Sequence, residues 1–193
     1  MDLVKGKKGL IMGVANERSI AWGISKKLAE NGAELAFTYF GDALKKRVTP
    51  LAESINSKFL LNCNVENKED IVKTFQEVKS KWNEIDFVVH AIAFSDRAEL
   101  SGQYIDTSRE NFAKSMLVSC FSFTEIAKEA SKIMKSGSSM LTLTYESTKV
   151  IPNYNVMGVC KAALESSVKY IAKDLGSKAV SYTHLTLPTK RIV

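Results

Sequence analysis

The sequence predicts an α/β fold, a Rossmann-type doubly wound parallel sheet in a single domain. Short apolar runs typical of buried strands alternate along the chain with longer amphipathic segments typical of helices. This alternation indicates a parallel sheet covered by helices on both faces. The length of 193 residues and a composition of 45% apolar and 25% charged residues are typical of one globular domain.

Each expected strand is an apolar run that ends at a glycine, an asparagine or a polar loop. The five strands are expected at Lys7–Val14, Ala33–Phe40, Lys58–Cys63, Glu84–Phe94 (with the loop that follows) and Ser138–Thr144.

Each expected helix begins at a capping residue or carries apolar residues at helical spacing. The helices are expected at Ser19–Asn31, Asp42–Ile55 with a break or restart at Pro50, Asn67 to Trp82, Thr107 to about Met134 with a capping box at its start and Gly137 closing it, and Asn153 to about Gly176.

Ligands of such sheets bind where the parallel strands end. Gly13 follows the first strand, and the helix that opens at Ser19 would offer its free amides and dipole to a pyrophosphate. We expect the Ser19 hydroxyl to cap this helix and to donate to the phosphate. The glycine spacing here is not G-x-G-x-x-G, so this turn is a weak signal by itself.

Tyr154 and Lys161 are the strongest candidates for chemistry. They are seven residues apart, which on a helix is two turns and places both side chains on one face. A nearby ammonium stabilises phenolate, so we expect Lys161 to lower the pKa of Tyr154 and make it a usable acid. A tyrosine and a lysine at this spacing are more often structural residues. Their position after the fifth predicted strand is what makes them a specific indication of an active site.

Three segments carry a resemblance to a known family: G-V-A-N-E-R-S-I-A-W-G, H-A-I-A-F, and above all I-P-N-Y-N-V-M-G at Ile151–Gly158. Together they resemble the bacterial enoyl-acyl-carrier-protein reductases of fatty-acid synthesis, a divergent group of short-chain dehydrogenases/reductases. The resemblance covers roughly residues 5–178.

The resemblance implies NADH-dependent reduction of the trans-2 double bond of an enoyl-acyl-carrier-protein thioester during fatty-acid elongation. It implies that Tyr154 stabilises the enolate oxygen, that Lys161 holds the nicotinamide ribose, that Tyr145 is a second active-site tyrosine and that Ser95 lies at the substrate mouth. The residues implied to line the NADH site are Gly13, Ser19, Ile20, Asn64, Val65 and Ile92. The family also implies a homotetramer packed through the two long helices.

The residues themselves favour NADH over NADPH. The second strand ends in Tyr39-Phe40-Gly41-Asp42, where an NADPH enzyme usually offers Arg or Lys to the 2′-phosphate. Phe40 is a candidate to pack against adenine, or is an ordinary apolar strand residue.

Two departures from the family pattern affect the site residues. Asn64 stands where the family has an acid. Tyr145 and Tyr154 are nine residues apart, one fewer than the family spacing, which leaves the placement of Tyr145 open.

Other readings remain at this point. Carbonyl reductases of the superfamily carry a serine about 13 residues before the tyrosine, whereas Met140 and Leu141 occupy that region here, with Ser139 and Thr142 nearby. A different short-chain carbonyl reductase and an inactive NAD-binding fragment are the two alternatives.

Composition argues against several other classes of protein. The net charge of +6 is spread among acidic residues, which does not favour nucleic-acid binding. No apolar run is long enough to span a membrane, no signal peptide is evident, and two histidines without a His-Cys cluster predict no metal site. Three dispersed cysteines fit a reducing cytoplasm.

The end of the chain departs from the family pattern. After residue 178 we expect a strand and a loop over the nicotinamide, but the sequence reads A-V-S-Y-T-H-L-T-L-P-T-K-R-I-V. We therefore expect residues 1–178 to form an incomplete enoyl reductase domain. We expect residues 179–193 to be an unrelated tail, an artefact on a truncated gene, so that the last strands of the family sheet are missing.

Overall fold

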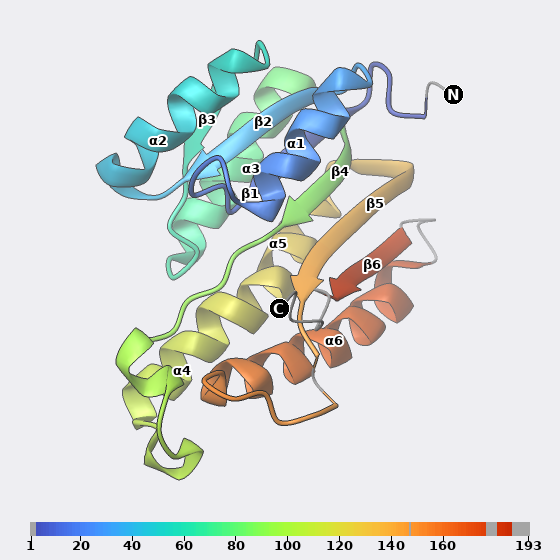
Figure 1. The fold of residues 1–193 in the computed structure, drawn as a ribbon. Helices are drawn as coiled ribbons and strands as arrows, with labels where there is room; N and C mark the ends of the chain where they lie inside the picture. Colours follow the sequence, from blue (N-terminus) through green and yellow to red (C-terminus); the bar gives the residue numbers. More distant parts are fainter. Residues whose placement is uncertain (1–2, 147, 177–180, 187–193) are drawn as a thin grey trace.

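The computed structural model describes residues 3–146, 148–176 and 181–186, the last of these by backbone alone. Within these residues, six strands form one parallel sheet in the order β3-β2-β1-β4-β5-β6 (Figure 1). The strands are β1 (Lys8–Met12), β2 (Glu34–Tyr39), β3 (Phe59–Asn62), β4 (Ile85–His90), β5 (Met134–Thr144) and β6 (Ser181–Thr186). This order is that of a dinucleotide-binding fold, and the predicted Rossmann-type sheet is confirmed.

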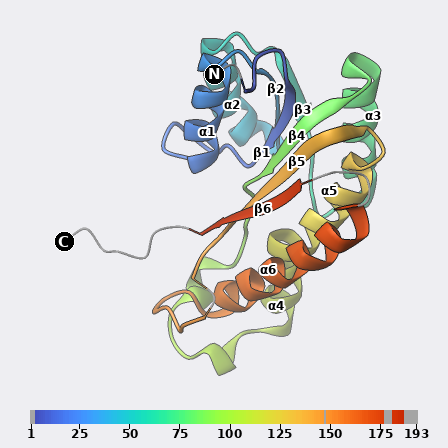
Figure 2. The ribbon, with the colours of Figure 1, turned by 90° about the vertical axis from the view of Figure 1, so that its right-hand side faces the viewer.

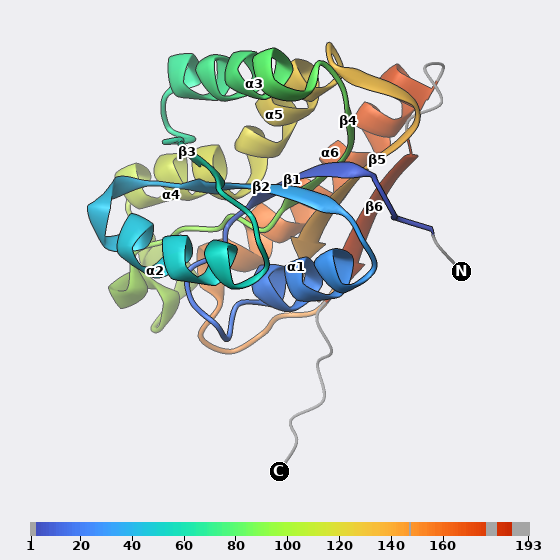
Figure 3. The ribbon, with the colours of Figure 1, turned by 90° about the horizontal axis from the view of Figure 1, so that it is seen from above.

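Helices cover both faces of the sheet, as Figure 3 shows: α1 and α2 lie on one side and α3, α5 and α6 on the other. The helices are α1 (Ile20–Glu30), α2 (Gly41–Ser54), α3 (Lys68–Trp82), α4 (Arg109–Met116), α5 (Ser122–Ala130) and α6 (Asn155–Leu175). Strand β1 shows the physical reason. Ile11 packs into the core beneath α1 and α2, whereas Leu10 and Met12 pack into the core beneath α3 and α5, and all three are fully buried. Alternate residues of a strand point to opposite faces, so a central strand must be apolar on both.

The helix expected from Thr107 to Met134 is interrupted. A π-helical turn at Leu117–Phe121 separates α4 from α5, and α5 ends at Ala130. The capping residue is Ser108, whose hydroxyl accepts the N–H of Asn111, so the predicted capping box was one residue out of register.

Gly137 does not close a helix, contrary to the prediction. It lies inside β5 with φ +82°, where the pairing of β5 with β4 shifts register between Ile85 and Phe87. A glycine in the left-handed region is typical of such an irregularity in a strand. Strand β5 therefore begins at Met134, four residues before the start predicted from the apolar run.

The predicted break at Pro50 was also wrong, because α2 runs through it. Pro50 is exposed, so water can bond the carbonyl that loses its helical partner. Val48 and Ala52 on either side of it are fully buried and hold the helix on the sheet.

The segment after α6 differs from expectation. The backbone of Ser181–Thr186 pairs in parallel with Ser139–Thr144, so the edge of β5 that we expected to be bare carries a sixth strand. Residues 177–180 and 187–193 lie outside the described residues. The origin of the segment 179–193 stays a prediction.

Candidate functional site

A cleft of about 370 Å³ opens where strands β1 to β4 end. Its lining is mostly apolar and comes from the ends of these strands and the loops that follow them, from α2 and α4, and from the turn after α4. Five residues predicted to bind the cofactor are part of it: Gly13, Phe40, Asn64, Val65 and Ile92. Residues of the lining that the sequence did not suggest include Leu44, Glu66, Phe94, Lys114 and Val118. Glu66 directly follows Val65, whereas nothing in the sequence connects Lys114 with the cleft.

Gly13, just after β1, packs directly against the backbone that follows β4. Its φ is +104°, and a Cβ at this position would lie 2.2 Å from the carbonyl oxygen of Ala91, which follows β4. Real side chains never approach a backbone oxygen so closely, so the floor of the cleft requires glycine both for its conformation and for the space.

Ser19 and Ile20 lie beside the cleft but not in its lining. Ser19 is the N-cap residue of α1 by position, but its hydroxyl oxygen accepts the N–H groups of Ala15 and Asn16, both at 3.0 Å, instead of bonding the helix. It therefore folds the loop before α1, which corrects the predicted capping role. The N–H groups of Ile20 and Ala21 donate to no acceptor among the residues that the structure describes.

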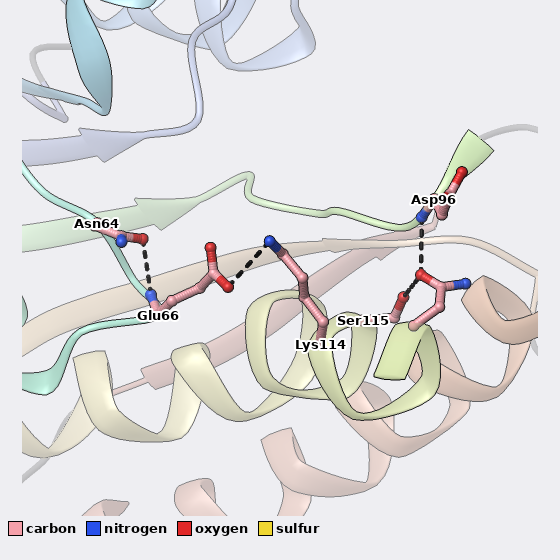
Figure 4. A network of polar contacts seen from close by, with 6 residues as sticks. Asn64, Glu66, Asp96, Lys114 and Ser115 are labelled. Atoms are coloured by element: carbon pink, nitrogen blue, oxygen red, sulfur yellow. Dashed lines mark hydrogen bonds and ion pairs between the residues drawn. The ribbon is translucent and has the colours of Figure 1, made fainter. Parts of the chain in front are cut away.

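A polar bridge crosses one side of the cleft (Figure 4). The Lys114 ammonium on α4 pairs with the Glu66 carboxylate at 3.2 Å and lies 4.8 Å from the centre of the Phe94 ring. The Asn64 side-chain oxygen accepts the Glu66 N–H at 3.1 Å, and the Asn64 N–H donates to Asp70 at 3.1 Å. The bridge therefore links the end of β3 to α4.

Tyr145, Tyr154 and Lys161, hereafter the tyrosine cluster, gather beyond the end of β5. The two rings are half-buried, with centroids 5.0 Å apart and planes at 57°. Tyr154 is the N-cap residue of α6, one residue outside the helix that was predicted to contain it. The Tyr154 hydroxyl has no hydrogen-bond partner within the described part of the chain, so it is free to bond a substrate.

Lys161 is buried at 6% exposure and ties α6 to β5 by donating from Nζ to the Leu143 carbonyl at 2.8 Å. Burial lowers the pKa of its ammonium to about 8. An ammonium has three donors, and this is its one hydrogen bond among the described residues, so two N–H groups are available to a ligand.

The predicted effect of Lys161 on Tyr154 is wrong. Burial, and secondarily the neighbouring Tyr145, raise the pKa of Tyr154 to about 12. Tyr154 lies just before the first residue of α6, and the Lys161 ammonium is hydrogen-bonded to a carbonyl of β5. The loss of hydration therefore has a larger effect on the Tyr154 pKa than any attraction between phenolate and ammonium. Tyr154 is therefore a protonated hydrogen-bond donor over the whole physiological range.

A fully buried histidine, His90 at the end of β4, is a polar group that the sequence reasoning passed over. Its ring nitrogens lie 3.0 Å from the Thr142 hydroxyl on β5 and 2.9 Å from the Ser122 hydroxyl on α5. Burial, with the charge of Lys161 next in size, lowers the pKa of His90 to about 3, so the ring is neutral. Thr142 is thereby directed into this buried network and not toward Tyr154. A histidine within an apolar strand was the only available signal.

Ser95 lies in the loop between β4 and α4. Its hydroxyl donates to the side-chain oxygen of Asn111 at 3.3 Å, and the same oxygen accepts the Asp96 N–H at 2.8 Å and the Ser115 hydroxyl at 3.1 Å, as Figure 4 shows in part. The loop is thus anchored to α4 through one amide side chain.

No group of three or more metal-ligating side chains occurs among the described residues, and within the same residues no helix is long and apolar enough to cross a bilayer. Cys63, Cys120 and Cys160 are free and buried.

The chain matches known proteins over nearly its whole described length. The profile of the family described as enoyl-(acyl carrier protein) reductase matches residues 13–182. This chain belongs to that family. A curated relative from Rhizobium meliloti (strain 1021), enoyl-[acyl-carrier-protein] reductase [NADH] 2, is 60% identical over 92% of this chain and 67% of its own length. A second, from Rickettsia bellii (strain RML369-C), is 52% identical over 92% of this chain and 68% of its own length. The chain spans about two thirds of the length of these relatives.

Solved enoyl reductases share the fold closely. The enzyme of Anaplasma phagocytophilum in complex with NAD superposes with a TM-score of 0.93 at 51% identity, over 97% of this chain and 72% of that one. The Bacillus cereus enzyme with NADP+ and an indole naphthyridinone gives a TM-score of 0.95 at 44% identity, over 99% of this chain and 76% of that one.

Proposed function

We propose that this chain reduces the trans-2 double bond of enoyl-acyl-carrier-protein thioesters with NADH, in fatty-acid elongation. The observation that carries the proposal is the Tyr154 hydroxyl, held beside Tyr145 at the start of the helix that carries the buried Lys161, with no hydrogen-bond partner among the described residues. A neutral phenol in this position is suited to bond an oxygen that gains negative charge during the reaction. Family membership and the NADH-dependent relatives support the same activity.

The residues of the cleft fit a dinucleotide. The N–H groups of Ile20 and Ala21 at the start of α1, which have no acceptor in the part of the chain that the structure describes, suit a pyrophosphate, and the exposed Phe40 suits adenine. The two unused donors of Lys161 suit ribose hydroxyls. Bound NADH would supply the hydride that the β-carbon of the substrate receives.

The tyrosine cluster then has two tasks. Tyr154 donates a hydrogen bond to the thioester carbonyl oxygen and holds the enolate that forms when the β-carbon is reduced. With a pKa of about 12, Tyr154 keeps its proton and acts through this bond. The proton that ends on the α-carbon then has to come from solvent. Tyr145, in contact with the Tyr154 ring, excludes water and limits the positions of that ring.

Reduction of a carbonyl is less well supported. A carbonyl reductase of this superfamily polarises its ketone with a hydroxyl on the strand before the tyrosine. Thr142 is the buried hydroxyl nearest that position, and it is engaged by His90.

The experiment is to follow NADH absorbance with purified chain and a crotonyl thioester, and in parallel with a ketone such as acetoacetyl thioester. Turnover of the enoyl substrate alone supports the proposal. Turnover of the ketone alone would identify a carbonyl reductase, and NADH binding without turnover of either would identify an inactive nucleotide-binding chain.

We further propose a cytoplasmic homotetramer that does not bind nucleic acid. Apolar side chains remain exposed along α4, the π-helical turn and α6, namely Phe112, Phe121, Val159 and Tyr170. Such a surface is suited to contact a second copy. Light scattering coupled to size-exclusion chromatography would measure the assembly.

A further inference from the structure

We infer that Asn155, next to the proposed catalytic tyrosine, is a positioning residue: its side-chain amide joins the substrate-side loop at 95–106 to Tyr154. The inference rests on the proposed function and adds a residue to its machinery. The loop and the start of α6 lie side by side beyond the sheet (Figure 2).

The backbone around Tyr154 is unusual. Asn153 has φ +58° and Asn155 has φ +26°, so two left-handed residues flank Tyr154, which itself has φ −126°. Left-handed conformations are disfavoured for residues other than glycine and persist only where the surrounding structure enforces them. The conformation of these two residues sets the direction in which the Tyr154 ring leaves the chain.

Hydrogen bonds of the Asn155 side chain help to hold this backbone conformation. Its Nδ2 lies 3.1 Å from the Glu99 carbonyl, 3.3 Å from the Ser101 carbonyl and 3.4 Å from the Gly102 carbonyl. Two N–H donors are thus shared among three carbonyls of one loop. Within the described part of the chain, these are the hydrogen bonds that connect the loop with α6.

The loop end of this connection is itself fixed. The Glu99 carboxylate accepts the Ser108 N–H at 2.9 Å, the Ser108 hydroxyl at 2.7 Å and the Asn111 amide at 3.1 Å. Asn111 in turn bonds Ser95. The chain of contacts therefore runs from the start of α4, through the loop that carries Ser95, to the residue beside Tyr154. Movement of the loop and rotation of Tyr154 are coupled through one amide group.

The test compares Asn155→Gly with Asn153→Gly. Glycine accepts the left-handed backbone at both positions, but only the first change removes the amide, because the Asn153 side chain makes no hydrogen bond among the residues described. We expect Asn155→Gly to lower kcat for crotonyl thioester about 10- to 100-fold, since small misplacements of reacting groups have effects of this size. The NADH dissociation constant and the melting temperature should stay near those of the unaltered chain. A purely structural role would instead lower the melting temperature and leave kcat per folded molecule unchanged.

A second variant, Asn155→Asp, keeps the size of the side chain and replaces the donor by a carboxylate facing three carbonyls. We expect a larger loss of kcat than with glycine at neutral pH, and partial recovery as the pH falls to about 4, where a protonated carboxyl can donate again. Equal activity of all three variants and the unaltered chain would overturn the inference, as would equal losses in Asn153→Gly and Asn155→Gly. If both Asn155 variants fail to fold, the amide holds the fold and not Tyr154, and the inference fails.

Trypsin cleavage after Arg97, which is exposed in the same loop, provides a measurement independent of turnover. We expect faster cleavage in Asn155→Gly and an unchanged rate in Asn153→Gly. If the unaltered chain reduces no enoyl thioester, the proposed function fails, whereas this cleavage difference still shows whether Asn155 holds the loop. No difference in cleavage would refute the connection itself.

Discussion

The cleft and the tyrosine cluster differ in which parts of the protein form them. The cleft, at the ends of β1 to β4, is shaped by close packing: Gly13 lies against the Ala91 carbonyl, and the rest of the lining is mostly apolar. The tyrosine cluster, beyond β5, depends on polar side chains, and burial has shifted the pKa values of two of them, Tyr154 and Lys161. Ligand binding in a site shaped by close packing should be sensitive to added atoms. Activity that depends on polar side chains should be sensitive to the removal of a single atom and to pH.

The largest effect is expected at Gly13. Gly13→Ala places a Cβ 2.2 Å from the Ala91 oxygen in a left-handed conformation, which should cost roughly 4 kcal/mol of folding free energy and abolish NADH binding. Denaturant unfolding and NADH titration measure both. Gly41→Ala is the matched control, because Gly41 has φ +76° but no atom near its Cβ position, and should cost only about 1 kcal/mol. Equal costs at the two positions would show that the close approach is not what shapes the cleft.

At the tyrosine cluster, removal of a single hydroxyl oxygen should be enough to lower activity. Tyr154→Phe should lower kcat about 10²- to 10³-fold, because a donor to the developing oxyanion is lost, with NADH affinity preserved. Tyr145→Phe is the control of the same type and should have a smaller effect, since its ring contact with Tyr154 remains. A larger loss in Tyr145→Phe would exchange the proposed roles of the two tyrosines.

The pH dependence should come from Lys161. Because its pKa is about 8 and that of Tyr154 about 12, kcat/KM should fall above pH 8, approaching tenfold per pH unit, as the ammonium loses its proton. Lys161→Arg, which stays charged, should remove this fall.

Stability should change in the opposite direction over the same range. The pKa of Lys161 is lowered from 10.5 to about 8 in the folded chain, so between about pH 8 and 9 the unfolded chain binds more protons and stability rises with pH, by at most about 1.4 kcal/mol per unit. Above about pH 9 the raised pKa values of Cys160 and Tyr154 act in the opposite direction. A fall in stability between pH 8 and 9 would attribute the loss of activity to unfolding.

The smallest effect is expected at the bridge across the cleft. The side chains of Glu66 and Lys114 are 34% and 45% exposed, so Glu66→Gln should cost less than about 1 kcal/mol of folding free energy. We expect a change of a few-fold in the NADH dissociation constant that disappears at high salt. Glu30→Gln, which breaks the exposed pair Lys27–Glu30 far from the cleft, should leave NADH binding unchanged. A large, salt-independent effect of Glu66→Gln would mean that this carboxylate contacts the nucleotide directly.

Residues at strand ends were predicted well from the sequence, whereas features that depend on tertiary packing were not. The structure places Gly13, Phe40, Asn64, Val65 and Ile92 in the cleft. These residues were named from the predicted strand ends or from the resemblance, and each lies at or just beyond the end of a strand, where parallel strands share one edge. Pro50 and the helix after Thr107 were misjudged because burial of the flanking residues and a π-helical turn overrode local propensity.

Three features can be predicted from the sequence alone: the alternation of strands and helices, the strand ends that form the cleft, and the signature around Tyr154 that indicates the family. These are local properties of the chain. Only the tertiary structure decided the ionisation of Tyr154 and Lys161, the buried partners of His90 and the contact of Asn155 with a loop more than fifty positions earlier. Hydration and hydrogen-bond partners of a buried group depend on which distant residues pack against it, and no local pattern of residue types encodes that packing.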